Sequence, residues 1–158
     1  MGNLFSAAEV VEIGIQIEKN GKDFYDGVLK SSKNAKAKET FGFLAGEEEK
    51  HIKRFEALLS QVKKYEPSEA YPGEYFAYLK ALSEGYVFTK ANKGAAIAGK
   101  IKSEKEAVDA GIGFEKDSIL FYHEMKKFIL DGEKKIVDNL IEEEQEHLKK
   151  LTEIKRNL

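Results

Sequence analysis

The sequence contains two versions of one ten-residue pattern, GEEEKHIKRF at residues 46–55 and EEEQEHLKKL at residues 142–151. Each version has a glutamate three residues before a histidine, Glu48 before His51 and Glu144 before His147. In an α-helix this spacing places both side chains on one face, about one turn apart. A carboxylate and an imidazole placed in this way can bind the same metal ion.

The similarity continues in the segment before each pattern. Residues 15–27 read IQIEKNGKDFYDG and residues 112–124 read IGFEKDSILFYHE, so that Glu18 corresponds to Glu115. Each of these glutamates stands about 30 residues before the glutamate of the following pattern. We therefore interpret the chain as two copies of one helical hairpin, packed with approximate two-fold symmetry. Such a pair can bring two equivalent sets of ligands together at its axis.

Hydrophobic periodicity predicts four long helices. Ser6 with Glu9 and Ser103 with Glu106 have the form of capping boxes at the starts of the first and third helices. The expected helices cover residues 6–31, 35–65, 103–130 and 133–156.

Residues 66–102 interrupt this pattern. Pro67 and Pro72 end the second helix, and an irregular, aromatic-rich segment follows, with a short helix predicted near residues 75–84. We therefore predict an all-α protein with a single domain over residues 1–158. Two antiparallel helical hairpins, joined by this long crossover, would form a four-helix bundle.

Composition narrows the range of functions. The 158 residues are 42% hydrophobic and 34% charged, which is typical of a globular protein. A net charge of −2 gives no reason to expect nucleic acid or a membrane as the partner. The absence of cysteine excludes disulfides, thiolate-bound zinc and iron–sulfur clusters in this chain. No spanning segment or signal-peptide pattern is present, so we expect a cytoplasmic protein.

The candidate metal ligands lie within apolar stripes. Phe41, Leu44 and Phe55 continue the stripe of the first pattern, and Val137 and Leu140 that of the second. Charged side chains in such a stripe need a partner. Four carboxylates would balance two divalent cations, whereas without cations they would be strongly unfavourable or would take up protons. The candidate ligands are Glu18, Glu48, His51, Glu115, Glu144 and His147.

Other interpretations of these residues remain open. A single Glu-x-x-His motif is weak evidence, and runs of glutamate usually form solvated helix faces. Glu47 and Glu143 stand four residues before the histidines and could also bind metal, although the apolar stripe favours Glu48 and Glu144. His123 is interpreted as a surface or outer-layer residue.

Two tyrosines follow the candidate ligands at equal distances. Tyr25 and Tyr122 stand seven residues after Glu18 and Glu115, which is two turns along the same stripes. They could hydrogen-bond to ligand carboxylates and orient them, or they could be ordinary core aromatics.

With these motifs the chain resembles the di-iron domain of the rubrerythrin family in the ferritin-like superfamily, over nearly its whole length. The resemblance implies that the six candidates bind two iron ions, with Glu48 and Glu144 bridging. The chain departs from the family pattern at Ser118, where rubrerythrins that reduce peroxide carry another glutamate. It also lacks their cysteine-ligated rubredoxin domain. The ligand set is equally similar to bacterioferritin-type sites.

The expected function is that of a di-iron oxidoreductase. Paired metals bridged by carboxylates react with oxygen species, and oxygen ligands with imidazole suit iron, with manganese or a mixed pair as alternatives. We expect hydrogen peroxide or dioxygen as substrate and a separate electron-donor protein. An iron-binding or ferroxidase protein without sustained turnover is the alternative, and a purely structural bundle is the third. A homodimer is expected, with the aromatic residues 71–88 as a candidate interface.

Overall fold

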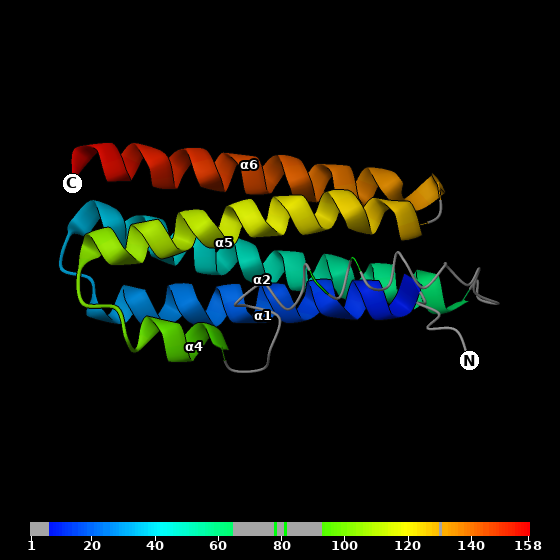
Figure 1. The fold of residues 1–158 in the computed structure, drawn as a ribbon, viewed down its shortest axis with the longest axis horizontal. Helices are drawn as coiled ribbons and strands as arrows, with labels where there is room; N and C mark the ends of the chain where they lie inside the picture. The colour runs from blue at the N-terminus through cyan, green and yellow to red at the C-terminus, as the bar shows by residue number, and fades with distance from the viewer. Residues whose placement is uncertain (1–6, 65–77, 79–80, 82–92, 130) are drawn as a thin grey trace.

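The fold is an all-α antiparallel four-helix bundle, as predicted (Figure 1). The computed structural model describes residues 7–64, 78, 81, 93–129 and 131–158. Helix α1 packs against α2 and α5, and α6 also packs against α2 and α5. Two hairpins, α1–α2 and α5–α6, therefore face each other. The long helices are α1 (Ala7–Ser31), α2 (Ala35–Lys64), α5 (Glu104–Met125) and α6 (Lys134–Asn157).

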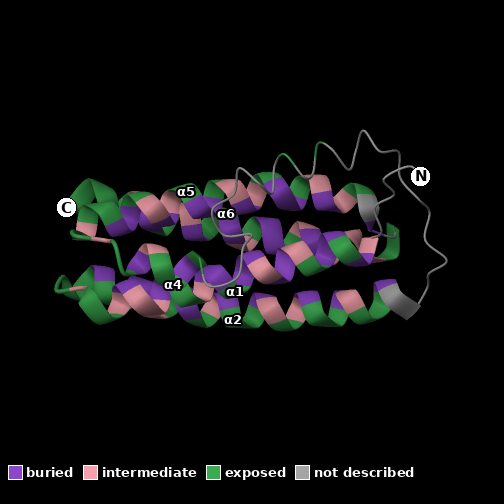
Figure 2. Ribbon diagram, turned by 60° about the horizontal axis from the view of Figure 1, so that its bottom comes forward, coloured by how far each residue is buried: buried purple, intermediate pink, exposed green. Residues whose placement is uncertain are grey.

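The core follows the apolar stripes of the four helices, and the buried residues turn toward the bundle axis (Figure 2). Aromatic side chains fill much of this space, and some of the largest have no exposed surface: Phe24, Tyr25, Phe41, Phe55, Phe121 and Tyr122. Such a dense, dry core can hold polar side chains at fixed positions.

Two helix starts are fixed by side-chain caps. The Ser103 hydroxyl accepts a hydrogen bond from the Glu106 N–H at 3.1 Å, which is the bond expected of a capping box. The Asn34 side chain accepts a hydrogen bond from the Ala37 N–H at 3.0 Å at the start of α2. Ser6 lies outside the described residues.

The third long helix ends earlier than predicted. Helix α5 stops at Met125 instead of residue 130, and a 3₁₀ turn, Lys126–Phe128, follows it. Ile129 is then extended and buried. A second 3₁₀ turn, Asp131–Glu133, then leads into α6. Residues 126–129, which were predicted to be helical, therefore belong to the connection between α5 and α6.

The crossover contains a short helix that the sequence analysis missed. Helix α4 (Lys93–Ala98) packs against α1, whereas the short helix predicted near residues 75–84 and the aromatic interface candidate fall almost entirely outside the described residues. Six residues are too few to show a hydrophobic period. The contact is close: the Gly94 N–H donates to Asn20 Oδ1 at 3.2 Å, and a Cβ at Gly94 would lie 1.8 Å from the Asn20 carbonyl oxygen.

Gly94→Ala is therefore expected to destabilise the protein. The added methyl group meets backbone, which cannot rotate away, so we expect a loss of ~1–3 kcal/mol and a melting temperature several degrees lower. Gly113→Ala is the matched control, because a Cβ there meets nothing within 4 Å and alanine favours the helix. Thermal unfolding followed by circular dichroism compares the two variants. Equal melting temperatures would contradict the close packing of α4 on α1.

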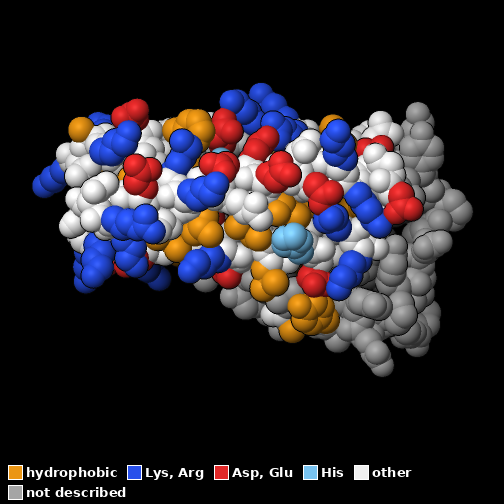
Figure 3. All heavy atoms as spheres, turned by 90° about the horizontal axis from the view of Figure 1, so that it is seen from above, with side chains coloured by type: hydrophobic (Ala, Val, Ile, Leu, Met, Phe, Trp, Pro, Cys, Tyr) orange, Lys and Arg blue, Asp and Glu red, His pale blue; other side chains and the backbone are white. Residues whose placement is uncertain are grey.

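The outer surface is strongly polar. On the face in Figure 3, lysine and arginine side chains are interspersed with aspartate and glutamate, with smaller hydrophobic areas between them. This mixture is typical of the solvent side of amphipathic helices. No described helix combines the length and the apolar character needed to cross a lipid bilayer.

Candidate metal centre

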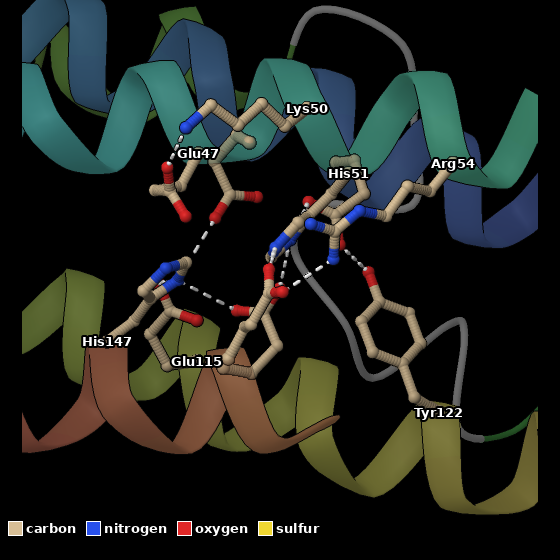
Figure 4. Close-up of polar contacts among 11 residues, drawn as sticks. Glu47, Lys50, His51, Arg54, Glu115, Tyr122 and His147 are labelled. Carbon is tan, nitrogen blue, oxygen red and sulfur yellow. Dashed lines mark hydrogen bonds and ion pairs between the residues drawn. The ribbon is translucent and has the colours of Figure 1, made fainter. Parts of the chain in front are cut away.

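The six candidate ligands meet inside the bundle. Helix α1 supplies Glu18, α2 supplies Glu48 and His51, α5 supplies Glu115, and α6 supplies Glu144 and His147. Figure 4 labels three of them, His51, Glu115 and His147. Five of the six side chains have no exposed surface, and the sixth is 2% exposed. We call Glu18, Glu48, His51, Glu115, Glu144 and His147 the Glu/His cluster.

The cluster divides into two overlapping sets of four residues. One ligand atom from each member of a set lies within 4.8 Å of the others. Glu48 and Glu144 belong to both sets, whereas each set has one glutamate and one histidine of its own. Two cations that share two carboxylates would need this arrangement. The sets are Glu18, Glu48, His51 and Glu144, and Glu48, Glu115, Glu144 and His147.

The unpaired atoms of the cluster fit such a pair of cations. Buried polar atoms are nearly always hydrogen-bonded, yet each of the six side chains has at least one buried oxygen or nitrogen without a hydrogen-bond partner among the described residues. Both oxygens of Glu48 and of Glu144, the two shared carboxylates, lack a hydrogen-bond partner among the described residues. The other unpaired atoms of the cluster are Glu18 Oε2, His51 Nδ1, Glu115 Oε2 and His147 Nδ1.

Both histidines turn the same nitrogen toward the shared carboxylates. His51 Nδ1 lies 2.7 Å from Glu144 Oε1, and His147 Nδ1 lies 3.3 Å from Glu144 Oε2. The two rings are nearly parallel, with centroids 5.5 Å apart. Glu144 therefore stands between two imidazoles, each of which could donate a nitrogen to a cation.

The carboxyl groups are crowded enough to change their protonation. Burial, followed by the charges of Glu18 and Glu144, raises the pKa of Glu48 well above its usual value. Burial and Glu144 raise the pKa of Glu115 in the same way. Although burial opposes it, close contacts with Glu115 and with both histidines lower the pKa of Glu144 well below its usual value. The cluster therefore needs added positive charge, from protons or from metal.

The histidines show the complementary effect. Burial lowers the pKa of His51, but the charge of Glu18 and contacts with Glu144 outweigh burial and raise this pKa to about 12. In the same way, burial lowers the pKa of His147 while Glu115 and Glu144 raise it to about 10. A metal that binds Nδ1 must displace these protons, so metal binding would release protons.

The two tyrosines reach across the bundle. Tyr25 on α1 donates a 2.7 Å hydrogen bond to Glu115 Oε1 on α5, and Tyr122 on α5 donates one to Glu18 Oε1 on α1. The sequence placed each tyrosine on the stripe of the glutamate in its own helix, but each bonds to the glutamate of the other hairpin. Burial, together with the nearby carboxylates, raises both tyrosine pKa values well above the usual value, so the hydroxyls stay protonated as donors.

The glutamates considered as alternative ligands lie farther out. Glu143 is one-third exposed and accepts hydrogen bonds from Arg54 and from Nε2 of His51. Glu47 lies within reach of both histidines, but its carboxylate pairs with Lys50 at 2.7 Å. Neither has an unpaired buried oxygen, which favours the inner glutamates as ligands. Sequence reasoning missed Arg54, although its position one turn after His51 on the same helix was a usable signal.

Two further residues differ in their surroundings. Ser118 is buried, and its hydroxyl has no hydrogen-bond partner among the described residues. His123 is exposed on α5, so it takes no part in the cluster.

The family follows from the sequence as a whole. The family model named Rubrerythrin matches residues 9–155. The chain belongs to the rubrerythrin family. This rubrerythrin-family chain is also similar to a crystal structure described as a ferritin-like diiron-carboxylate protein from Thermotoga maritima. The two share 26% sequence identity, with a TM-score of 0.74 over 99% of this chain and 98% of that one. A search of curated proteins found no match. Together, the family and the buried cluster support a dimetal site.

Proposed function

We propose that the Glu/His cluster binds two iron ions and that the protein is a di-iron oxidoreductase acting on hydrogen peroxide or dioxygen. The observation that carries this proposal is the arrangement of buried carboxylate and imidazole atoms in two overlapping groups. Glu48 and Glu144 would bridge the metals, and each remaining glutamate and histidine would bind one of them. Carboxylate and imidazole ligands suit iron, and also manganese.

The protein surroundings are suited to reductive chemistry. Bound iron would supply the two electrons that convert hydrogen peroxide and two protons into two molecules of water. Tyr25 and Tyr122 hold one oxygen of each outer glutamate, so the other oxygen is free to bind metal. Phe41 packs on Tyr25 and Phe55 on Tyr122, with ring centroids 6.3 and 5.1 Å apart, and these rings exclude water from both hydrogen bonds.

We propose that a separate protein donates the electrons, because these 158 residues contain no cysteine to hold an iron–sulfur or rubredoxin-type centre. A reduced carrier protein in the cytoplasm would fit this cycle, and a homodimer is the assembly we propose.

The alternative function is iron binding or ferroxidation without sustained turnover. Ser118 favours it, because a hydroxyl occupies the position where peroxide-reducing rubrerythrins carry another carboxylate.

The experiment measures the metal content of the protein and then the rate at which each oxidant oxidises the reduced protein. Protein from iron-supplemented cells should contain about two irons per chain, and His51→Ala and His147→Ala should each lower this number. His123→Ala should not lower it, because this histidine is exposed. The reduced protein is then mixed without air with hydrogen peroxide or with dioxygen. Faster oxidation by peroxide, with repeated turnover, supports the peroxidase. Faster oxidation by dioxygen without turnover supports the alternative, and no stoichiometric metal refutes both.

A further inference from the structure

We propose that the two metal positions are inequivalent, because Glu143 and Arg54 act as positioning residues for His51 alone. The position formed with Glu18 and His51 then binds metal more tightly and fills first. This inference rests on the dimetal site proposed above and adds an order of loading to it.

The argument begins with a chain of three polar side chains. His51 Nε2 lies 2.7 Å from Glu143 Oε2, and Arg54 Nη1 donates to Glu143 Oε1 at 2.6 Å. His51 and Arg54 stand on α2, whereas Glu143 stands on α6. Figure 4 shows the Arg54 side chain running alongside His51 toward this contact. These three side chains therefore connect the two hairpins directly beside the Glu/His cluster.

This contact fixes how His51 presents its other nitrogen. A carboxylate that accepts the Nε2 proton leaves Nδ1 as the nitrogen that binds metal and holds the ring in one orientation. His51 Nδ1 is the atom that faces Glu18 and Glu144, at 3.4 and 2.7 Å. The Arg54 pair in turn keeps the Glu143 carboxylate in place. Such outer contacts typically change metal affinity by ~10–100-fold.

Within the described part of the chain, no glutamate bonds to Nε2 of His147 as Glu143 does to that of His51. By the internal repeat, Glu47 corresponds to Glu143, but Lys50 on its own helix holds the Glu47 carboxylate at 2.7 Å. The contacts of His147 with carboxylates among the described residues are all made by Nδ1. Its ring lies nearly perpendicular to that of Phe43, with centroids 6.2 Å apart.

The difference between the halves can be traced to single positions of the repeat. Lys50 corresponds to Glu146, so the second half has no cation one turn after Glu143 to draw its carboxylate away. Arg54 corresponds to Lys150, whose ammonium lies 5.1 Å from the centroid of the Phe43 ring. The first half thus supplies the arginine that anchors Glu143, whereas its counterpart in the second half is engaged elsewhere.

The test is a cobalt(II) titration of metal-free protein, followed by visible absorption. Wild-type protein should bind two equivalents in two steps. Glu143→Ala should weaken the first step by ~10–100-fold, and Arg54→Ala should weaken it less. Glu47→Ala is the matched comparison, because it removes the corresponding glutamate of the repeat, and it should weaken the first step less than Glu143→Ala does. Circular dichroism checks that each variant is folded.

Single-position variants then identify the affected site. The His147→Ala variant keeps only the metal position that contains His51. Adding Glu143→Ala to this variant should lower its affinity for the one cobalt ion that it binds. His51→Ala leaves the other position, and Glu143→Ala should not change its affinity. Two equal affinities in the wild type, or equal effects of Glu143→Ala and Glu47→Ala, would overturn the inference while the dimetal function stands. Failure of the wild type to bind cobalt or iron would overturn both.

Discussion

Glu48→Gln is expected to remove both metals, whereas Glu18→Gln is expected to remove one. Glu48 belongs to both sets of ligand atoms, and both of its oxygens are unpaired. Glu18 belongs to one set, and one of its oxygens already accepts a hydrogen bond from the Tyr122 hydroxyl. An amide in place of a bridging carboxylate loses the charge and one of the two metal-binding oxygens. Replacing Glu48 should therefore lower the number of bound metals by twice as much as replacing Glu18.

Iron per chain, measured after purification under identical conditions, gives the first readout. Thermal unfolding gives the second, because each bound metal at a hundredfold excess over its dissociation constant stabilises the fold by about 2.7 kcal/mol. The metal-dependent rise in melting temperature should vanish in Glu48→Gln and be halved in Glu18→Gln. Glu115→Gln, the equivalent of Glu18 in the repeat, should also lose one metal. If Glu18→Gln and Glu48→Gln lose the same number, Glu48 does not bridge.

The metal-free protein is expected to become less stable as the pH rises from about 5 to about 9, whereas the metal-loaded protein should not. Groups whose pKa is raised by folding stabilise the fold below their ordinary pKa, and this stabilisation is lost as the pH approaches the raised value. The pKa of His51 is raised to about 12 and that of His147 to about 10. The raised pKa values of Glu48 and Glu115 act in the same direction.

Glu144 sets the lower limit of this range. Its pKa is lowered by folding, so its stabilisation is present above the ordinary carboxyl pKa and disappears in more acidic solution. Maximum stability without metal is therefore expected near pH ~5. A tenfold change in proton affinity is worth about 1.4 kcal/mol, so several shifted groups should together give a loss above ~3 kcal/mol. Urea unfolding of chelator-treated protein at several pH values measures this loss of unfolding free energy.

Bound metal should reverse the dependence of stability on pH. Cations bind to deprotonated ligands, and more of the ligands are deprotonated as the pH rises. Glu48→Gln in the metal-free form should show a weaker loss of stability at high pH, since it removes one group with a raised pKa. A stability that rises with pH in the absence of metal would mean that the cluster is solvated rather than buried.

Local patterns were enough to predict most of the fold. The stripe of apolar residues around Glu48 and His51, repeated around Glu144, predicted the helices and the face that each of them buries. The Ser103 cap was predicted because its partner, Glu106, is three residues away in the sequence. By contrast, helix α4 is held by the contact of Gly94 with Asn20, 74 residues away. A six-residue helix has no periodicity that could have predicted it.

The early end of α5 has the same explanation. Nothing in the residues before Leu130 stops a helix, and the sequence continues with helix-favouring side chains as far as Phe128. In the structure the chain leaves the helix, and Ile129 is extended and buried in the core. Burial of that residue is a property of the packed bundle.

The sequence by itself determined which six residues could meet. The spacing of Glu48 and His51 is a periodicity of one helix, and the repeat of this hairpin can be read directly from the sequence. Only the tertiary structure decided that Tyr25 bonds to Glu115 and that Glu143 bonds to His51. Those contacts join helices of different hairpins, about 90 residues apart in the chain. They depend on how far each helix is rotated and shifted against its neighbour. That choice is made by the packing of side chains across the core, and no local pattern encodes it.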